Sequence, residues 1–180
     1  MGKADAQLTE TDGVRWPDRN HPGNSSIHVR NELNMTATPS LVWAWLVRAP
    51  LWPNWYENAS DVRIAGPEED LTDGSRFRWK TMGITVSCKV TEYIFEERIA
   101  WSGRAFGIEV HHAWVLTPSN LGCKVLTEET QRGWPAILGK LFLLPRQMHA
   151  AHQLWLEGLQ CQAQSGSPPS ATDDVTPRTN

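Results

Sequence analysis

The sequence predicts an α+β fold in which an antiparallel sheet of seven strands is covered on one face by helices. Three observations support this prediction. An alternating strand is followed by two short helical segments, the chain from Gly74 onward then alternates with period two, and a long helix with one apolar stripe comes last. Only short links separate the alternating segments, which favours antiparallel neighbours. Strands and helices that are segregated along the chain in this way are typical of the α+β class.

The first part of the folded region is predicted to form one strand and two short helices. Residues 27–37 alternate between apolar and polar side chains, as in a half-buried strand. Thr38 suits an N-cap, Pro39 suits the first position of the helix that follows, and Pro50 ends that helix. The next segment, LWPNWYEN, indicates a second short helix or a turn.

Six further strands and a long helix are expected after these elements. The strands cover SDVRIAG, the alternation around Phe77 and Trp79, Ile84 to Val90, RIAWSGRAFG, GIEVHHAWVLTP and CKVLTEETQ. The helix has an apolar stripe formed by Leu141, Leu144, Met148, His152, Trp155 and Leu159. Pro145 lies inside this stripe and should kink or split the helix near Leu141.

Length and composition indicate a single domain that needs neither disulfides nor a metal to fold. The chain has 180 residues and a formal net charge of -3, and this weakly acidic balance gives no reason to expect nucleic acid as a partner. Cys88, Cys123 and Cys161 are far apart and form no CxxC pair, which predicts free thiols and a cytoplasmic location. We expect no signal peptide and no membrane insertion, because no apolar run is long enough.

The ends of the chain differ from its middle in composition. Residues 1–26 are polar and lack periodicity, so they are expected to form a flexible arm. Residues 27–164 are expected to form the ligand-binding domain. Residues 165–180 are rich in Ser, Pro and Thr and are expected to be a disordered tail.

Several segments together resemble the START-like helix-grip superfamily, in its branch of bacterial polyketide cyclase/dehydrase and lipid-transport proteins. ATPSLVWAWLVRAPLWPNWYENASDVRI resembles the opening of that fold, with a tryptophan-containing second helix. GSRFRW, VTEYIFEERIAW and HHAWVLTPSNLGCKVLTEETQRG resemble its strand series, and RQMHAAHQLWLEGLQCQA resembles the end of its long helix. The resemblance covers about Ile27 to Gln164 and is one of order and spacing.

The resemblance implies a curved seven-stranded sheet that wraps around the C-terminal helix. Between sheet and helix the family has an elongated cavity for an apolar ligand, with the two short helices and loops at its mouth. Relatives bind sterols, lipids, hormones or aromatic polyketides. Some only carry the ligand, and others cyclise or dehydrate it.

Two pairs of histidines are candidate functional residues. Neighbours on a strand face opposite sides, so His111 and His112 cannot bind one metal together. His112 shares an apolar face and should be either a buried, hydrogen-bonded imidazole or a general acid/base, whereas His111 is expected to be exposed. On the long helix, His149 and His152 could chelate a metal only with a third ligand from the sheet. We favour structural histidines or a polar contact from His152 into the cavity, and expect no metal.

Glu129 is a third candidate for proton transfer. If Val125 faces inward, Thr127 and Glu129 do so too. A carboxylate near an apolar wall would have a raised pKa and could move protons, and the alternative is a rim residue paired with an arginine. No nucleophile or nucleotide-binding motif stands out.

The ten tryptophans either fill a solid core or form flat walls around a ligand. With the cavity of the family as context, we expect the inward-facing residues to contact an aromatic or polycyclic ligand. This set is Trp55, Phe77, Trp79, Val86, Cys88, Trp101, Val110, Trp114, Thr127, Leu141, Met148 and Trp155.

The function favoured by these expectations is binding of a hydrophobic small molecule and cyclisation or dehydration of a polyketide-like chain. Catalysis would be mostly positioning, with His112 and either His152 or Glu129 moving protons and without any cofactor. A non-catalytic carrier or sensor of the same ligands is the alternative, and a protein-interaction module is a third possibility. We expect a monomer or a homodimer.

Overall fold

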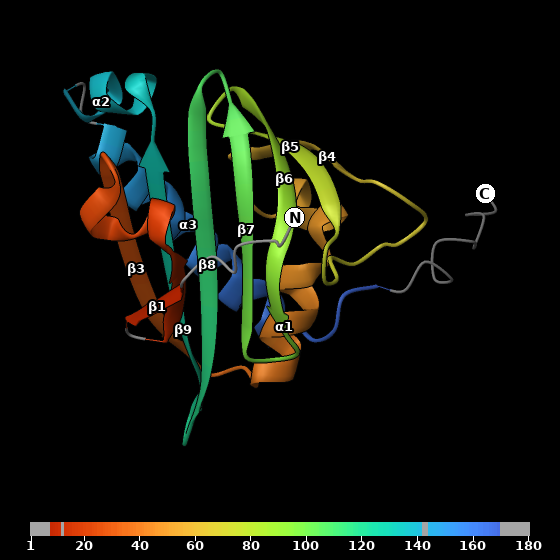
Figure 1. The fold of residues 1–180 in the computed structure, drawn as a ribbon. Helices are drawn as coiled ribbons and strands as arrows, with labels where there is room; N and C mark the ends of the chain where they lie inside the picture. The colour runs from red at the N-terminus through yellow and green to blue at the C-terminus, as the bar shows by residue number, and fades with distance from the viewer. Residues whose placement is uncertain (1–7, 12, 142–143, 170–180) are drawn as a thin grey trace, which may run out of the picture.

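The computed structural model describes residues 8–11, 13–141 and 144–169, without the side chains of residues 8, 9, 11 and 139–141. Its centre is a seven-stranded antiparallel sheet with the spatial order β3-β9-β8-β7-β6-β5-β4 (Figure 1). The strands are β3 (Ile27–Met35), β4 (Ala59–Ile64), β5 (Arg76–Thr81), β6 (Ile84–Ile94), β7 (Arg98–Ala105), β8 (Ile108–Ser119) and β9 (Gly122–Arg132). The predicted α+β class and the predicted order of elements are confirmed.

The helices pack against one face of this sheet, called the inner face below. α1 (Pro39–Val47) and the 3-10 helix η3 (Ala49–Asn54) connect β3 to β4. Thr38 caps α1 as expected, since its hydroxyl accepts a hydrogen bond from the backbone N–H of Leu41 at 3.4 Å.

The C-terminal helical region is split as the proline predicted. α2 (Trp134–Leu141) ends before α3 (Leu144–Ser165) begins, and Pro145 is the second residue of α3, where its missing N–H costs no helical hydrogen bond. Met148, His152, Trp155 and Leu159 are buried along the stripe of α3 that faces the sheet. In Figure 1 this helix runs behind the strands.

An aromatic cluster fills the middle of the space between α3 and the inner face. Trp52 of η3 lies at its centre, with ring centroids 5.1 Å from Trp155, 5.4 Å from Trp79 and 5.8 Å from Trp101. The Trp52 indole N–H donates to the carbonyl of Leu46 at 3.0 Å, so its polar atom is satisfied inside the core. Much of the tryptophan content therefore forms solid core.

The N-terminal segment is more ordered than its composition predicted. β1 (Leu8–Thr11) and β2 (Val14–Pro17) form a hairpin that lies on the outer face of the sheet, on the side opposite α3 (Figure 1). Val14 and Trp16 are buried there against an apolar patch consisting of Ala100, Ala113 and Leu126. The sequence pattern did not predict this packing, because the segment is mostly polar and a single Val and a single Trp create no periodicity.

The C-terminal segment also begins with structure. α3 runs to Ser165, and the next residues pass beside α1, where the Trp45 indole donates to the carbonyl of Gly166 at 2.7 Å. Arg48 donates to the carbonyl of Pro169 at 3.0 Å. The remainder of the expected disordered tail, residues 170–180, lies outside the described residues. Within the described part of the chain, no helix has the length and apolar character that crossing a membrane requires.

Replacing Trp16 by alanine tests whether the hairpin is part of the folded domain. The side chain is fully buried, so we expect Trp16→Ala to lower the free energy of unfolding by about 3–5 kcal/mol in urea denaturation. Trp134→Ala is the matched control, since Trp134 is 69% exposed and its loss should cost well under about 1 kcal/mol. Equal stability of the two variants would show that the hairpin contributes nothing to the fold.

Candidate functional site

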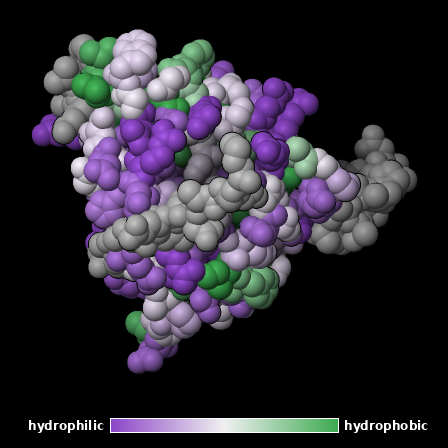
Figure 2. All heavy atoms as spheres, in the orientation of Figure 1, coloured by the Kyte–Doolittle hydropathy of each residue, from purple (hydrophilic) through white to green (hydrophobic). Residues whose placement is uncertain are grey.

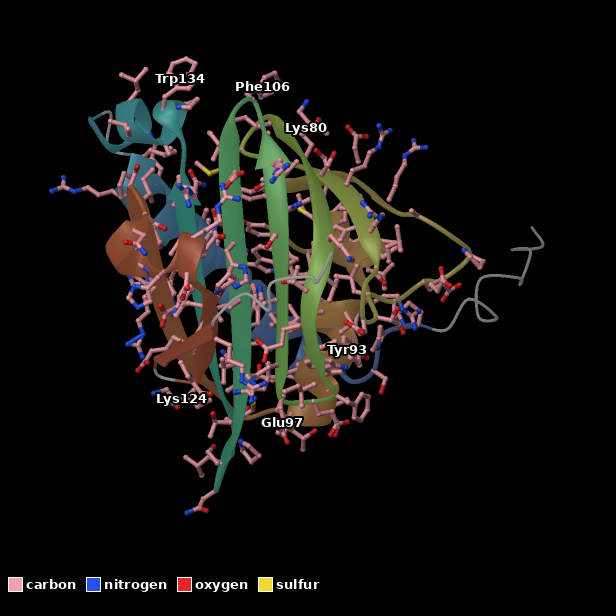
Figure 3. The ribbon with its side chains drawn as sticks, in the orientation of Figure 1. Lys80, Tyr93, Glu97, Phe106, Lys124 and Trp134 are labelled. Carbon is pink, nitrogen blue, oxygen red and sulfur yellow. The ribbon has the colours of Figure 1, made fainter. Side chains whose placement is uncertain are left out.

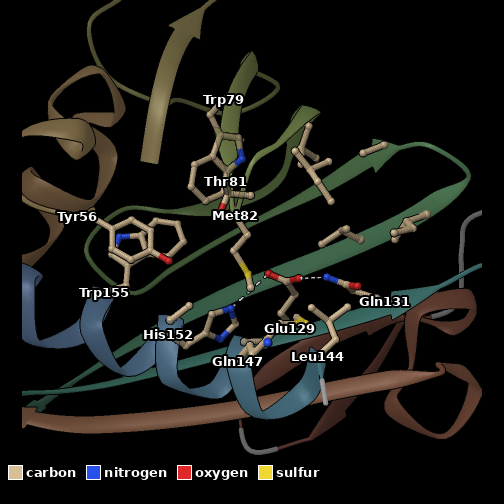
Figure 4. A pocket seen from close by; sticks show the side chains of 17 residues that line it. Tyr56, Trp79, Thr81, Met82, Glu129, Gln131, Leu144, Gln147, His152 and Trp155 are labelled. Atoms are coloured by element: carbon tan, nitrogen blue, oxygen red, sulfur yellow. Dashed lines mark hydrogen bonds and ion pairs between the residues drawn. The ribbon is translucent and has the colours of Figure 1, made fainter. Parts of the chain in front are cut away.

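A cavity of about 230 Å³ lies between α3 and the inner face of the sheet, at the end of α3 nearer α2 (Figure 4). Strand residues Trp79, Val86 and Val110 form one side, and helix residues Met148 and Trp155 form the other. The volume exceeds a cavity of about 150 Å³ that is known to hold benzene, so it suits a ligand of one or two rings.

Three aromatic rings, those of Tyr56, Trp79 and Trp155, form one wall of the cavity. Tyr56 and Trp155 stack with ring centroids 4.7 Å apart and an interplanar angle of 12°. Trp79 lies 5.2 Å from Trp155 at a tilt of 50°. In Figure 4 the Met82 side chain extends from the β5–β6 turn toward Glu129, opposite this wall.

Glu129, the polar group of the cavity, is held by residues from β9, β8 and α3. Its Oε1 accepts a hydrogen bond from Gln131 Nε2 at 2.8 Å. Its Oε2 lies 3.4 Å from His152 Nε2 and 3.2 Å from His112 Nδ1, and the second contact lacks hydrogen-bond geometry. Both the β8–β9 register, which pairs His112 with Glu129, and the buried stripe of α3 produce this cluster.

His112 lies behind the cavity surface. Its ring is almost completely buried, and its Nε2 is 2.7 Å from the hydroxyl of Thr127. The rings of His112 and His152 stack at 4.8 Å with an interplanar angle of 8°. His112 therefore positions its neighbours, whereas Glu129 and His152 face the cavity.

Burial and hydrogen bonding fix the protonation states of this cluster. Burial lowers the pKa of His112 to about 3, so the ring is neutral at pH 7. Burial alone would raise the pKa of Glu129, but the hydrogen bond from His152 and, in acid, the charge that His112 gains below about pH 3 outweigh it and lower this pKa to about 2. The raised pKa expected for Glu129 is thus incorrect, and the carboxylate is ionised at neutral pH.

The same three side chains form a candidate metal site. One ligand atom from each of His112, Glu129 and His152 lies within 4.8 Å of the others, and the donor types suit zinc. A metal bound to imidazole lies in the plane of the ring, along the nitrogen lone pair. The two imidazole rings are stacked and nearly parallel, so no single position lies in both planes. The geometry therefore fits a hydrogen-bonded cluster better than a metal centre.

The structure brings about half of the expected site residues to the cavity. Lining residues among them are Trp79, Val86, Val110, Glu129, Met148, His152 and Trp155. The others, which do not line the cavity, are Trp55, Phe77, Cys88, Trp101, His112, Trp114 and Thr127. Several of these are held in the aromatic core, as for Trp101, whose ring lies 5.6 Å from Phe77. The side chain of Leu141 lies outside the described residues.

The two histidines of the HH pair face opposite sides, as the strand pattern predicted, but His111 is not exposed. Only 2% of its surface is accessible, because the Trp16 ring packs on it with centroids 5.5 Å apart. The N-terminal hairpin is the reason for this correction, since it covers the outer face. On α3, His149 is exposed, and its carbonyl accepts a hydrogen bond from Asn31 at 3.2 Å.

Sequence reasoning missed several lining residues. They are Tyr56, Thr81, Met82, Ile84, Ala105, Ile108, Gln131, Leu144, Gln147 and Ala151. Gln131 could have been found by continuing the alternation of β9 two residues beyond Glu129. Met82 also carried a signal, because it occupies the first position of a two-residue turn with φ of 48°, followed by Gly83 at 81°. Such turns favour Asn or Gly, so a methionine there indicates a role for its side chain.

A sheet packed around a long C-terminal helix, with a cavity between them, defines a helix-grip-like fold. The chain belongs to the polyketide cyclase / dehydrase and lipid transport family, whose model matches residues 26–164. None of the proteins with a curated description matches the chain.

Solved structures share this fold. A hypothetical protein of Helicobacter pylori, jhp0584, is 30% identical with a TM-score of 0.78, over 87% of this chain and 99% of that one. The protein TTHA0849 of Thermus thermophilus is 20% identical with a TM-score of 0.65, over 78% and 99%. The di-domain ARO/CYC StfQ from the steffimycin biosynthetic pathway is 15% identical with a TM-score of 0.65, over 83% and 54%. The last two similarities concern the fold alone.

The buried histidines predict a loss of stability in mild acid. Burial lowers the pKa of His111 to about 4 and that of His112 to about 3, from 6.5 in the unfolded chain. Below pH 6.5 the unfolded chain therefore binds more protons, so stability present above this pH is lost as the pH falls toward the folded-state values. Between pH 6 and pH 5 these two groups should lower the free energy of unfolding by about 2 kcal/mol in total.

Urea denaturation of His111→Gln and His112→Gln at both pH values isolates each contribution. Each variant should show a fall in stability from pH 6 to pH 5 that is smaller than in the parent by about 1 kcal/mol. In the parent and in His111→Gln, Glu129 does not interfere, because its lowered pKa affects stability only below about pH 4.5. An unchanged pH dependence in both variants would contradict the assignment of two neutral, buried rings.

Proposed function

We propose that the protein binds a small hydrophobic ligand in this cavity, with a ring against the Tyr56–Trp155 stack and a polar group at Glu129. One observation carries the proposal: a mainly apolar cavity is lined by the carboxylate of Glu129, whose side chain is only 12% exposed. Burying a charge costs folding stability unless it is well paired, and the contacts of Glu129 Oε2 with the two histidines are long. The position of such a group beside a cavity favours a role in binding.

The family and the cavity support the same proposal. Family membership points to hydrophobic ligands, and flat aromatic walls with a few convergent polar groups are typical of small-molecule sites. The volume favours ligands smaller than the extended polycycles that the tryptophan content suggested. The proposal requires no cofactor, and the free Cys88, Cys123 and Cys161 support a reducing compartment such as the cytoplasm.

Filling the cavity tests ligand binding directly. Ala151 lines the cavity from α3, whereas the adjacent Ala150 is exposed, so Ala151→Phe and Ala150→Phe form a matched pair. Titration with one- and two-ring aromatic compounds, followed by tryptophan fluorescence, should show saturable quenching in the parent and in Ala150→Phe. Ala151→Phe should bind at least about tenfold more weakly, because its ring occupies the ligand space. Equal binding by both variants would place the ligand elsewhere.

Catalysis of cyclisation or dehydration is a second candidate function. The observation that favours it is the His152–Glu129 pair, which faces the cavity. The pair would take a proton from a carbon next to a carbonyl, and would return it to the hydroxyl that leaves as water. Among the three predicted catalytic residues, His152 is the best candidate for this transfer, because Glu129 is a weak base at a pKa of about 2 and His112 lies behind the surface.

Mass spectrometry separates this enzyme from a carrier or sensor. Incubation with linear β-keto compounds should give a product lighter by one water in the parent protein. In His152→Gln the product should form at least about a hundredfold more slowly while binding is kept, since acid–base groups typically contribute that much. Saturable binding without any change in mass would leave the carrier or sensor as the function.

The protein-interaction alternative also has one supporting observation. Phe106, Trp134, Ile137 and Leu138 are exposed at the end of the molecule that carries α2. Figure 2 shows apolar residues gathered at this end, and Figure 3 labels Phe106 and Trp134 there. Ala105 and Ile108, which flank the Phe106 turn, line the cavity. This apolar patch therefore adjoins the cavity. It can be explained as a surface for a protein partner or, equally well, as the rim of the cavity entrance.

A further inference from the structure

The charges around the cavity point to the chemical class of its ligand. We propose that the cavity takes small aromatic molecules that present an N–H or O–H donor, including a protonated amine, to Glu129, and excludes molecules that present a carboxylate. The inference rests on the proposed ligand binding and narrows it.

The part of the lining that the structure describes carries one formal negative charge and no lysine or arginine. Among the described residues that line the cavity, Glu129 is the only Asp, Glu, Lys or Arg. Arg132 follows on the same strand but belongs to the other side, where it donates to the carbonyl of Arg19 at 2.7 Å and lies 3.8 Å from Glu109. A ligand carboxylate would therefore meet a like charge in a poorly hydrated space, where repulsion is strong.

Glu129 also has free capacity to accept hydrogen bonds. An ionised carboxylate offers about four acceptor positions. Gln131 occupies one on Oε1 at 2.8 Å, whereas the contacts on Oε2 are 3.4 Å from His152 and 3.2 Å from His112, the latter without hydrogen-bond geometry. Charge-assisted bonds are normally about 2.7–2.9 Å long. A donor on the ligand would supply the strong partner that Oε2 lacks.

The aromatic wall favours the same ligands. The rings of Trp79, Tyr56 and Trp155 line the cavity, and an aromatic lining favours neutral or cationic ligands over anions. The indole N–H groups of Trp79 and Trp155 are buried without a partner, and they would suit a ligand acceptor. These donors are neutral, so they do not offset the charge of Glu129.

Three probes with one ring system test the inference by isothermal calorimetry at pH 8, above the usual titration range of histidine. They are 2-naphthylmethylamine, 2-naphthol and 2-naphthoate, which carry a cation, a neutral donor and an anion. We expect the amine and the naphthol to bind, and the naphthoate to bind at least about tenfold more weakly than either. If the parent protein bound the naphthoate as tightly as the amine, the inference would be overturned, and no variant would be needed to show this.

Glu129→Gln removes the charge at nearly constant size. It should weaken the amine at least about tenfold and should strengthen the naphthoate. Glu157→Gln is the control, since Glu157 lies on the exposed side of α3 and its loss changes net charge equally. An unchanged order of affinities in Glu129→Gln would contradict the role of this carboxylate. If no probe binds, the proposed ligand site itself is wrong. If all three probes bind equally well, the ligand site stands and only the inferred preference for donors over carboxylates is wrong.

Discussion

Strand β8 is buried on both of its faces, and this constraint organises the rest of the molecule. A strand presents successive side chains to opposite sides of its sheet. On the inner side α3 covers His112, and on the outer side the N-terminal hairpin covers His111 through Trp16. Each imidazole is therefore held neutral in a dry environment. The cluster around Glu129 forms because the register of β8 and β9 places His112 directly beside Glu129.

The aromatic core determines where a ligand space remains. Trp52 enters from η3 and occupies the middle of the volume between sheet and helix, in contact with Trp101 and Trp155. The cavity lies beside this packed centre, toward α2, where Ala151 and Met148 leave room beneath the strands. Packing thus limits the volume of the cavity, and Glu129 is the one acidic or basic side chain among the lining residues that the structure describes, histidine aside.

Sequence patterns predicted the sheet, the helix order and the inward direction of His112, because alternation and proline positions act locally. They could not predict the fate of individual tryptophans, since the same alternation describes Trp79, which reaches the cavity, and Trp101, which is held in the core. Burial of His111 was missed because it depends on a hairpin anchored by isolated residues. The sign of the Glu129 pKa shift was missed because it depends on His152, which is distant in sequence.

The proposed ligand site depends on Glu129 being an ionised acceptor in the lining of the cavity. Its side-chain carboxyl carbon, assigned by comparison with Glu129→Gln, can be followed by carbon-13 NMR in the full chain. The lowered pKa, about 2, predicts the chemical shift of an ionised carboxylate that stays constant from pH 8 down to about pH 5. If this chemical shift changed with pH within that range, Glu129 would be binding a proton there. The carboxylate would then not be fully ionised near neutral pH, contrary to the expectation.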